Sequence, residues 1–88
     1  MEKAKVYFTP EISAAALQQI YQALGVHLKG KVAVKISTGE PGGHNFLQPA
    51  LIKDLVQQLQ GTIVECNTAY EGRRNTTEAH WQAIREHG

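Results

Sequence analysis

The sequence lacks the features on which several classes of protein depend. Cys66 is the only cysteine in 88 residues, so this chain alone cannot form an internal disulfide, a zinc knuckle or an iron–sulfur cluster. No segment approaches the roughly 20 apolar residues of a membrane span, and the N-terminus lacks the apolar core of a signal peptide. A lone cysteine is typical of a reducing compartment. We therefore expect a cytoplasmic protein without a membrane partner.

The sequence also lacks an excess of positive or negative charge. Nine Lys and Arg residues oppose eight Asp and Glu residues, which gives a formal net charge of +1. Such a balance produces no field that would attract nucleic acid or an anionic membrane, so neither is an expected partner. A chain of 88 residues can bury only a modest core and forms one domain at most.

Three short apolar runs alternate with three helical patterns. The runs at 4–8, 31–36 and 62–66 are rich in β-formers and predict strands. The pattern predicts a first helix that begins at Pro10, after a Thr9 cap, and ends at Gly25. A second helix is predicted from Pro49 to Gly61, and a third is predicted to follow Asn75 as its cap, with Glu78 completing a capping box.

Strict alternation of strands and helices with short links predicts parallel strands joined by right-handed crossovers. The expected fold is therefore α/β: a three-layer βαβαβα unit with a short parallel sheet, part of a larger doubly wound domain. Parallel sheets normally have both faces covered and more than three strands. Residues 1–88 are thus expected to be the N-terminal fragment of a longer domain, or a single domain that completes its sheet by self-association.

Two polar loops follow the second and third predicted strands, at 37–48 and 67–75. Ligands of open parallel sheets bind beyond the carboxyl ends of the strands, so both loops are expected to share one rim. The first loop, STGEPGGHNFLQ, contains neither GxxxxGK nor GxGxxG. Gly42 and Gly43 would let backbone approach a ligand, with Asn45 beside it and His44 as a proton donor or acceptor.

The second loop, NTAYEGRRNT, leads into the third predicted helix. Arg73 and Arg74 lie beside the predicted helix N-terminus and predict a binding site for a phosphate or carboxylate. Asn67 and His80 are candidate ligand-binding residues next to it. Simpler interpretations stay open: turn-forming glycines, solvated arginines, a hydrogen-bonding loop His44, and a His80 that only flanks Trp81. Spacing between the histidines and the cysteine matches no compact zinc pattern, so no metal site is predicted.

Two charged residues interrupt the predicted strands. Lys35 lies within VAVKI and Glu65 within IVEC, and isolated charges are costly in a covered sheet. Either the two side chains pair at the base of the predicted pocket, or each lies at a sheet edge and reaches water. Lys35 joins His44 as a candidate catalytic residue.

The two loop motifs, GEPGGHNFL and ECNTAYEGRRNTTEAH, resemble those of the bacterial family known as domain of unknown function 362, whose longer members are described as uncharacterised iron–sulfur centre proteins. The resemblance covers nearly the whole chain and implies the N-terminal part of a longer, redox-linked protein. It also implies that His44, Asn45, Asn67, Arg73, Arg74 and His80 belong to a shared site. The cysteines that bind the cluster in relatives are absent here, so cluster binding is not carried over.

The functional hypothesis is a cytoplasmic, redox-linked protein segment whose loops 37–48 and 67–75 contribute to a pocket for a small anionic ligand or cofactor. The identity of the cofactor, the reaction and whether the chain is an enzyme are left open. The alternative is a non-catalytic α/β module that acts by self-association or partner binding. Concentration of polar residues at one rim favours the first hypothesis, and the absence of a further strand after Gly88 is expected to favour the second.

Overall fold

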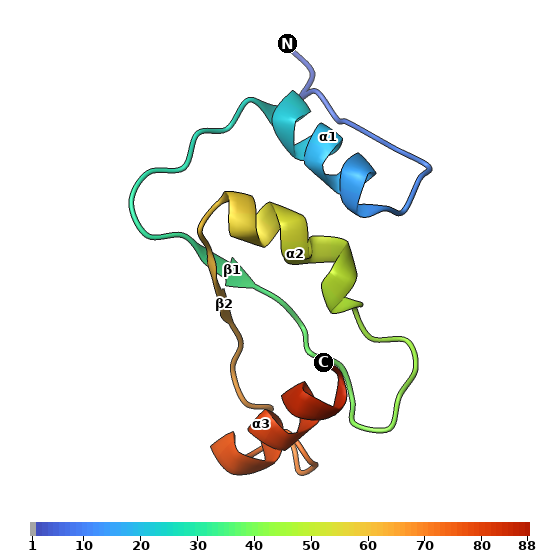
Figure 1. The fold of residues 1–88 in the computed structure, drawn as a ribbon, viewed down its shortest axis with the longest axis vertical. Coiled ribbons are helices and arrows are strands. Elements are labelled where there is room, and N and C mark those ends of the chain that lie inside the picture. The colour runs from blue at the N-terminus through green and yellow to red at the C-terminus, as the bar shows by residue number, and fades with distance from the viewer. Residues whose placement is uncertain (1) are drawn as a thin grey trace.

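The computed structural model of the chain describes residues 2–88 and has a small α/β fold (Figure 1). Its elements, in chain order, are α1 (Ala14–Leu24), β1 (Ala33–Lys35), α2 (Pro49–Gln58), β2 (Thr62–Val64) and α3 (Thr77–Glu86). The two strands are parallel, with Ala33 opposite Thr62 and Lys35 opposite Val64. The prediction of an α/β fold with a short parallel sheet is confirmed.

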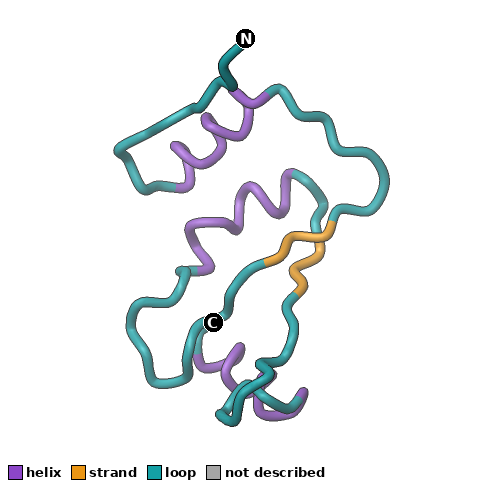
Figure 2. Tube along the Cα trace, turned by 180° about the vertical axis from the view of Figure 1, so that it is seen from behind, coloured by secondary structure: helices purple, strands orange, loops and turns teal. Residues whose placement is uncertain are grey.

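The helices lie at two ends of the molecule. α1 packs against α2 at one end, and α3 lies at the other end, where the polypeptide arrives from both strands (Figures 1 and 2). The connection from β1 to α2 passes alongside α3 before it returns to α2 (Figure 2). The carboxyl ends of the strands therefore lead toward α3, and this arrangement positions the site.

The predicted first strand is wrong. Residues 4–8 form no strand, and the sheet contains only β1 and β2 among the residues that the structure describes. Val6 and Phe8 keep 88% and 84% of their surface exposed. Alternating β-formers specify a strand only where a sheet edge is available to pair with them, and this segment runs beside α1 instead (Figure 1).

The start of α1 also differs from the prediction. The helix begins at Ala14, because the Ser13 hydroxyl accepts a hydrogen bond from the Ala16 N–H at 3.0 Å and caps the first turn. Thr9 instead accepts from the Glu11 N–H at 3.2 Å, within the preceding loop. The C-terminal prediction is confirmed, since Gly25 ends the helix in the left-handed conformation with φ of 64°.

α2 begins at Pro49 as predicted but ends before Gly61. The left-handed residue after this helix is Gln60, with φ of 51°. Gly61 has a different role, because a Cβ there would lie 2.9 Å from a Val34 methyl group; glycine lets the end of α2 approach β1 closely.

The N-cap of α3 lies one residue later than predicted. The side chain of Thr76, rather than Asn75, accepts from the Ala79 N–H at 3.2 Å. Burial is concentrated where α3 meets the loops: Thr38 and His80 are buried polar residues, and Ala83 of α3 is fully buried. The best-packed part of this end of the molecule is therefore polar.

Candidate functional site

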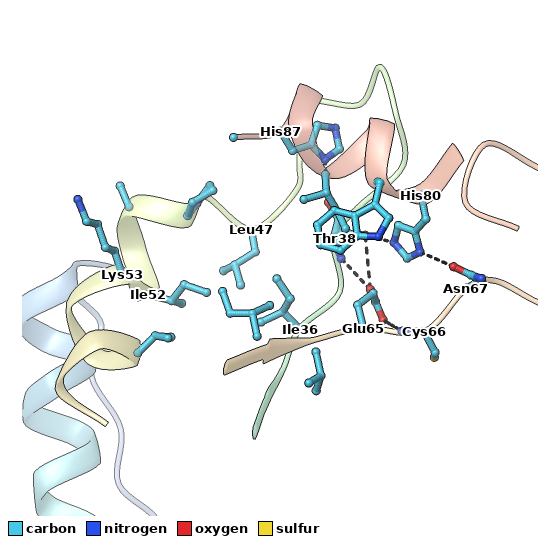
Figure 3. Close-up of a pocket in the computed structure, with 18 of the residues that line it drawn as sticks. Ile36, Thr38, Leu47, Ile52, Lys53, Glu65, Cys66, Asn67, His80 and His87 are labelled. Atoms are coloured by element: carbon cyan, nitrogen blue, oxygen red, sulfur yellow. Dashed lines mark hydrogen bonds between the residues drawn. The ribbon is translucent and has the colours of Figure 1, made fainter. Parts of the chain in front are cut away.

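Thr38, three residues beyond β1, is held by hydrogen bonds to all of its polar groups (Figure 3). Its N–H donates to Glu65 Oε2 at 2.9 Å, and its hydroxyl lies 2.7 Å from His80 Nε2. Its carbonyl oxygen accepts from His87 Nδ1 at 2.7 Å. We call Thr38, Glu65, Asn67, His80 and His87 the Thr38 cluster. It joins the loop after β1, the end of β2 and one face of α3.

Asn67 fixes the tautomer of His80 within this cluster. Asn67 Oδ1 lies 3.1 Å from His80 Nδ1, and Asn67 Nδ2 donates to Thr77 Oγ1 at 3.3 Å, which sets the orientation of the amide. An amide oxygen only accepts, so His80 Nδ1 carries the proton. In the neutral ring Nε2 is then an acceptor, and the Thr38 hydroxyl donates to it at 2.7 Å, with Glu65 Oε2 as a more distant second acceptor at 3.5 Å.

Glu65 anchors the cluster as a carboxylate. Burial raises the pKa of the Glu65 carboxyl, but hydrogen bonds from Lys35, the Thr38 N–H and the Cys66 N–H outweigh burial and lower that pKa to about 2. Lys35 Nζ lies 2.8 Å from Glu65 Oε1, and the two side chains are 55% and 10% exposed. Both interpretations of the strand charges thus hold in part: the charges pair, and Lys35 also reaches water.

A cleft of about 1190 Å³ opens between α2, the strands and α3 (Figure 3). All five residues of the Thr38 cluster lie along its wall at one end. The remainder is mainly apolar and is lined by Ile36, Leu47, Pro49, Ile52, Val56, Ile63, Val64, Trp81 and Ile84. Lys53 and the exposed thiol of Cys66 also line it. The cleft therefore has an apolar body and a polar end.

The predicted arginine pair lies elsewhere. Arg74 contacts Glu40 and donates to the Tyr70 hydroxyl at 3.0 Å, and Tyr70 donates to Glu40 at 2.8 Å. Hydrogen bonds from Tyr70 and Arg74 hold the pKa of Glu40 below its usual range, and the Glu40 hydrogen bond raises the pKa of Arg74. Arg73 pairs with Glu86 at 2.6 Å. Neither arginine lines the cleft.

The predicted glycine turn lies on the surface. The Gly43 N–H donates to the Glu40 carbonyl oxygen at 3.1 Å, and Gly42 has φ of 80°. His44 and Asn45 follow as exposed residues. None of these four residues lines the cleft, nor does Lys35, so the structure brings only Asn67 and His80 of the predicted site residues to it. The functions assigned to the others stay predictions.

Thr38 and His87 are the cluster members that sequence reasoning missed. A signal for His87 was present: it lies seven residues after His80, which places both rings on one side of a helix, with Ala83 between them. Thr38 carried a weaker signal, as the second residue after an apolar run. The His87 ring also stacks on Phe46, which lies in the same loop as Thr38, with ring centroids 3.8 Å apart.

No three His, Cys, Asp or Glu side chains in residues 2–88 gather closely enough to hold a metal ion. Likewise, the helices described here are too short or too polar to cross a membrane.

The chain matches no known protein-family model, no curated protein and no solved structure. Fold and site thus define a small α/β protein with an amphipathic cleft, and the resemblance to domain of unknown function 362 stays a prediction.

Proposed function

We propose that the chain binds a small organic ligand or cofactor in the cleft between α2 and α3. The observation that carries the proposal is an apolar cavity of about 1190 Å³ with polar groups gathered at one end. Sites for small molecules have this composition, because apolar walls supply affinity and a few polar groups fix orientation. The ligand would place an alkyl or aromatic portion against Ile52, Ile63 and Trp81 and a polar group at the Thr38 cluster.

The charge of the ligand is a separate part of the proposal. The two arginines predicted to hold an anion are paired with Glu40 and Glu86 outside the cleft lining. An anionic group could reach Arg74 only by displacing Glu40, whose side chain is 56% exposed, and Lys53 is the one Lys or Arg among residues 2–88 that lines the cleft. We therefore favour a ligand with a neutral polar group. The redox-linked role implied by the resemblance is a further proposal, supported by sequence alone.

Trp81 provides the test, because it is the only tryptophan and it lines the cleft. Octanol, naphthol, a nicotinamide nucleotide, a flavin and inorganic phosphate would be titrated while its fluorescence and the melting temperature are recorded. A ligand that binds the folded state alone must raise the melting temperature. We expect a saturable response to the amphipathic compounds and none to phosphate.

Two variants with matched exposure make this test specific. Ile63 lines the cleft and Val26 lies outside its lining, and both are 47% exposed. Ile63→Asp should weaken binding at least tenfold, while Val26→Asp should leave it unchanged. Equal binding by the two variants, or no saturable response to any compound, would contradict the proposal.

Self-association is the second candidate function, because the sheet has two strands while a β-rich segment at 4–8 stays exposed. In parallel sheets, strands are normally covered and extended by neighbours. Sedimentation velocity of the wild type and of a Val6→Lys/Phe8→Lys variant would test this candidate. A wild type that is monomeric at all concentrations would rule it out.

A further inference from the structure

Three side chains of the Thr38 cluster form a continuous chain of hydrogen bonds. Asn67 Oδ1 lies 3.1 Å from His80 Nδ1, and His80 Nε2 lies 2.7 Å from Thr38 Oγ1. This order is hydroxyl, imidazole and orienting amide. The same order of roles defines an activated nucleophile in enzymes of unrelated fold, where a base removes the hydroxyl proton and a third group holds the base.

The protonation pattern required for such a reaction follows from the contacts. Asn67 keeps the proton on Nδ1, so the neutral His80 ring offers its Nε2 lone pair to the Thr38 hydroxyl. His80 is only 4% exposed, and its ring is fixed at both nitrogens. Both distances lie within the range for proton transfer through a hydrogen bond.

The surroundings of Thr38 provide access from the cleft and one neighbouring backbone donor, Gly39, which is not itself among the residues that line the cleft. Thr38, His80 and Asn67 line the polar end of the cleft, where an apolar ligand would place its polar group. The N–H of Gly39, the residue after Thr38, donates no hydrogen bond to any residue from 2 to 88. The N–H that follows a nucleophile is a common donor to the oxyanion of acyl transfer.

We propose that Thr38 is an acyl-accepting nucleophile, with His80 as its general base and Asn67 as a positioning residue. The substrate class is an ester or thioester with an apolar acyl chain, because the cleft beside Thr38 is lined mainly by aliphatic and aromatic groups. This inference rests on the proposed function, since the acyl chain would occupy the same cleft.

The reaction has two balanced halves. Thr38 Oγ1 forms a bond to the acyl carbon while His80 Nε2 takes the hydroxyl proton; the bond from that carbon to the leaving alkoxide or thiolate breaks, and the leaving group takes the proton from His80. Water then attacks the acyl carbon while His80 accepts a water proton; the bond between that carbon and Thr38 Oγ1 breaks, and Thr38 Oγ1 takes the proton from His80. The products are a carboxylic acid and an alcohol or thiol, with no change in oxidation state.

The test uses p-nitrophenyl acetate, butyrate, hexanoate and octanoate. We expect an initial burst of nitrophenolate that becomes faster as the acyl chain lengthens. Mass spectrometry should find one added acyl group on the peptide that contains Thr38. Thr38→Val keeps the side-chain volume and should abolish the adduct, whereas Thr38→Ser should retain it. Ser37→Ala, which removes the exposed neighbouring hydroxyl, is the control and should react as the wild type does.

His80→Gln should slow acylation by about 10²–10⁴-fold, the usual contribution of a general base. Asn67→Asp should move the acid limb of the pH–rate profile to higher pH, because a carboxylate favours the imidazolium; a merely structural Asn67 would change the melting temperature and leave the profile in place. Circular dichroism would confirm that the variants are folded, with Thr38→Ser as the conservative reference. Absence of a Thr38 adduct, or equal rates in wild type and His80→Gln, would overturn the inference.

Binding of octanamide, which cannot acylate Thr38 readily, separates this inference from the proposed function. If Trp81 fluorescence reports octanamide binding but no ester acylates Thr38, the nucleophile inference fails and the binding cleft stands. If neither octanamide nor any compound of the binding panel gives a saturable response, both proposals fail.

Discussion

The two loops that leave the strands meet in two polar clusters of opposite character. The Thr38 cluster lines the cleft and has Thr38 and His80 buried at its centre, whereas the cluster of Glu40, Tyr70 and Arg74 has its carboxylate and phenol at the surface. Sequence reasoning assigned function to the charged residues of the second cluster. In both clusters a carboxylate is the shared acceptor, and the two differ in its exposure: the Glu65 side chain is 10% exposed and the Glu40 side chain is 56% exposed.

The largest effect should come from removing the charge that anchors the Thr38 cluster. Glu65→Gln weakens the hydrogen bonds from Thr38, Lys35 and Cys66, and should lower the free energy of unfolding by about 2–3 kcal/mol, as for other buried charge-assisted hydrogen bonds. Urea denaturation followed by Trp81 fluorescence would measure the loss. A change below about 0.5 kcal/mol would mean that Glu65 contributes no more than an ordinary surface ion pair and would contradict this prediction.

Gly39→Ala should have the next largest effect, because it strains the backbone between the two clusters. Gly39 has φ of 84°, and a Cβ there would lie 2.5 Å from Phe46 Cβ. We expect a loss of about 1–3 kcal/mol from the left-handed conformation and the overlap together. Gly42→Ala is the matched control, with a similar φ of 80° and no neighbouring atom within 4 Å. Equal losses in both variants would show that conformation alone, and not packing against Phe46, is responsible.

The loss of stability in acid should depend mainly on Glu65 of the Thr38 cluster. Its folded-state pKa of about 2 lies below the ordinary value of 4.5, so its contribution to stability is complete above about pH 4.5 and is lost as the pH falls toward 2. The free energy of unfolding should therefore decrease over this window. The decrease should be much smaller in Glu65→Gln than in Glu40→Gln, and the reverse order would contradict the assignment of the acid response to the buried carboxylate.

The smallest effect should come from Glu40→Gln at the exposed cluster. Its hydrogen bonds with Tyr70 and Arg74 compete with water, so we expect a loss of at most about 1 kcal/mol. The loss should shrink further in 1 M salt, where surface charges are screened. A loss as large as that of Glu65→Gln would remove the distinction between the clusters.

Local signals in the sequence predicted local structure well. Pro49 at the start of α2, Gly25 at the end of α1 and the parallel pairing of β1 with β2 follow from residue preferences and from the alternation of strands and helices. The segment at 4–8 failed because strand formation depends on a partner edge, which no local pattern reveals.

The structure brings only two of the predicted site residues to the cleft, and the function assigned to the site stays a prediction. Asn67 and His80 were identified from their position at the predicted rim, and the structure places both on the cleft wall. His44, Arg73 and Arg74 were chosen for their chemistry, but their location depends on contacts with residues more than ten positions away, such as Arg74 with Glu40 and Arg73 with Glu86. Thr38 was missed because its importance comes entirely from long-range hydrogen bonds.

The attachment of Thr38 to α3 through both its hydroxyl and its carbonyl oxygen has a consequence for local unfolding. Residues 37–39 would lose two of their anchors if α3 moved away, because His80 and His87 hold Thr38 from the helix side and only Glu65 would still hold its N–H. Opening of the loop and detachment of the C-terminal helix should therefore be one cooperative event. In hydrogen exchange, the Thr38 amide should exchange at the same opening free energy as the central amides of α3, although it lies far from them in the sequence.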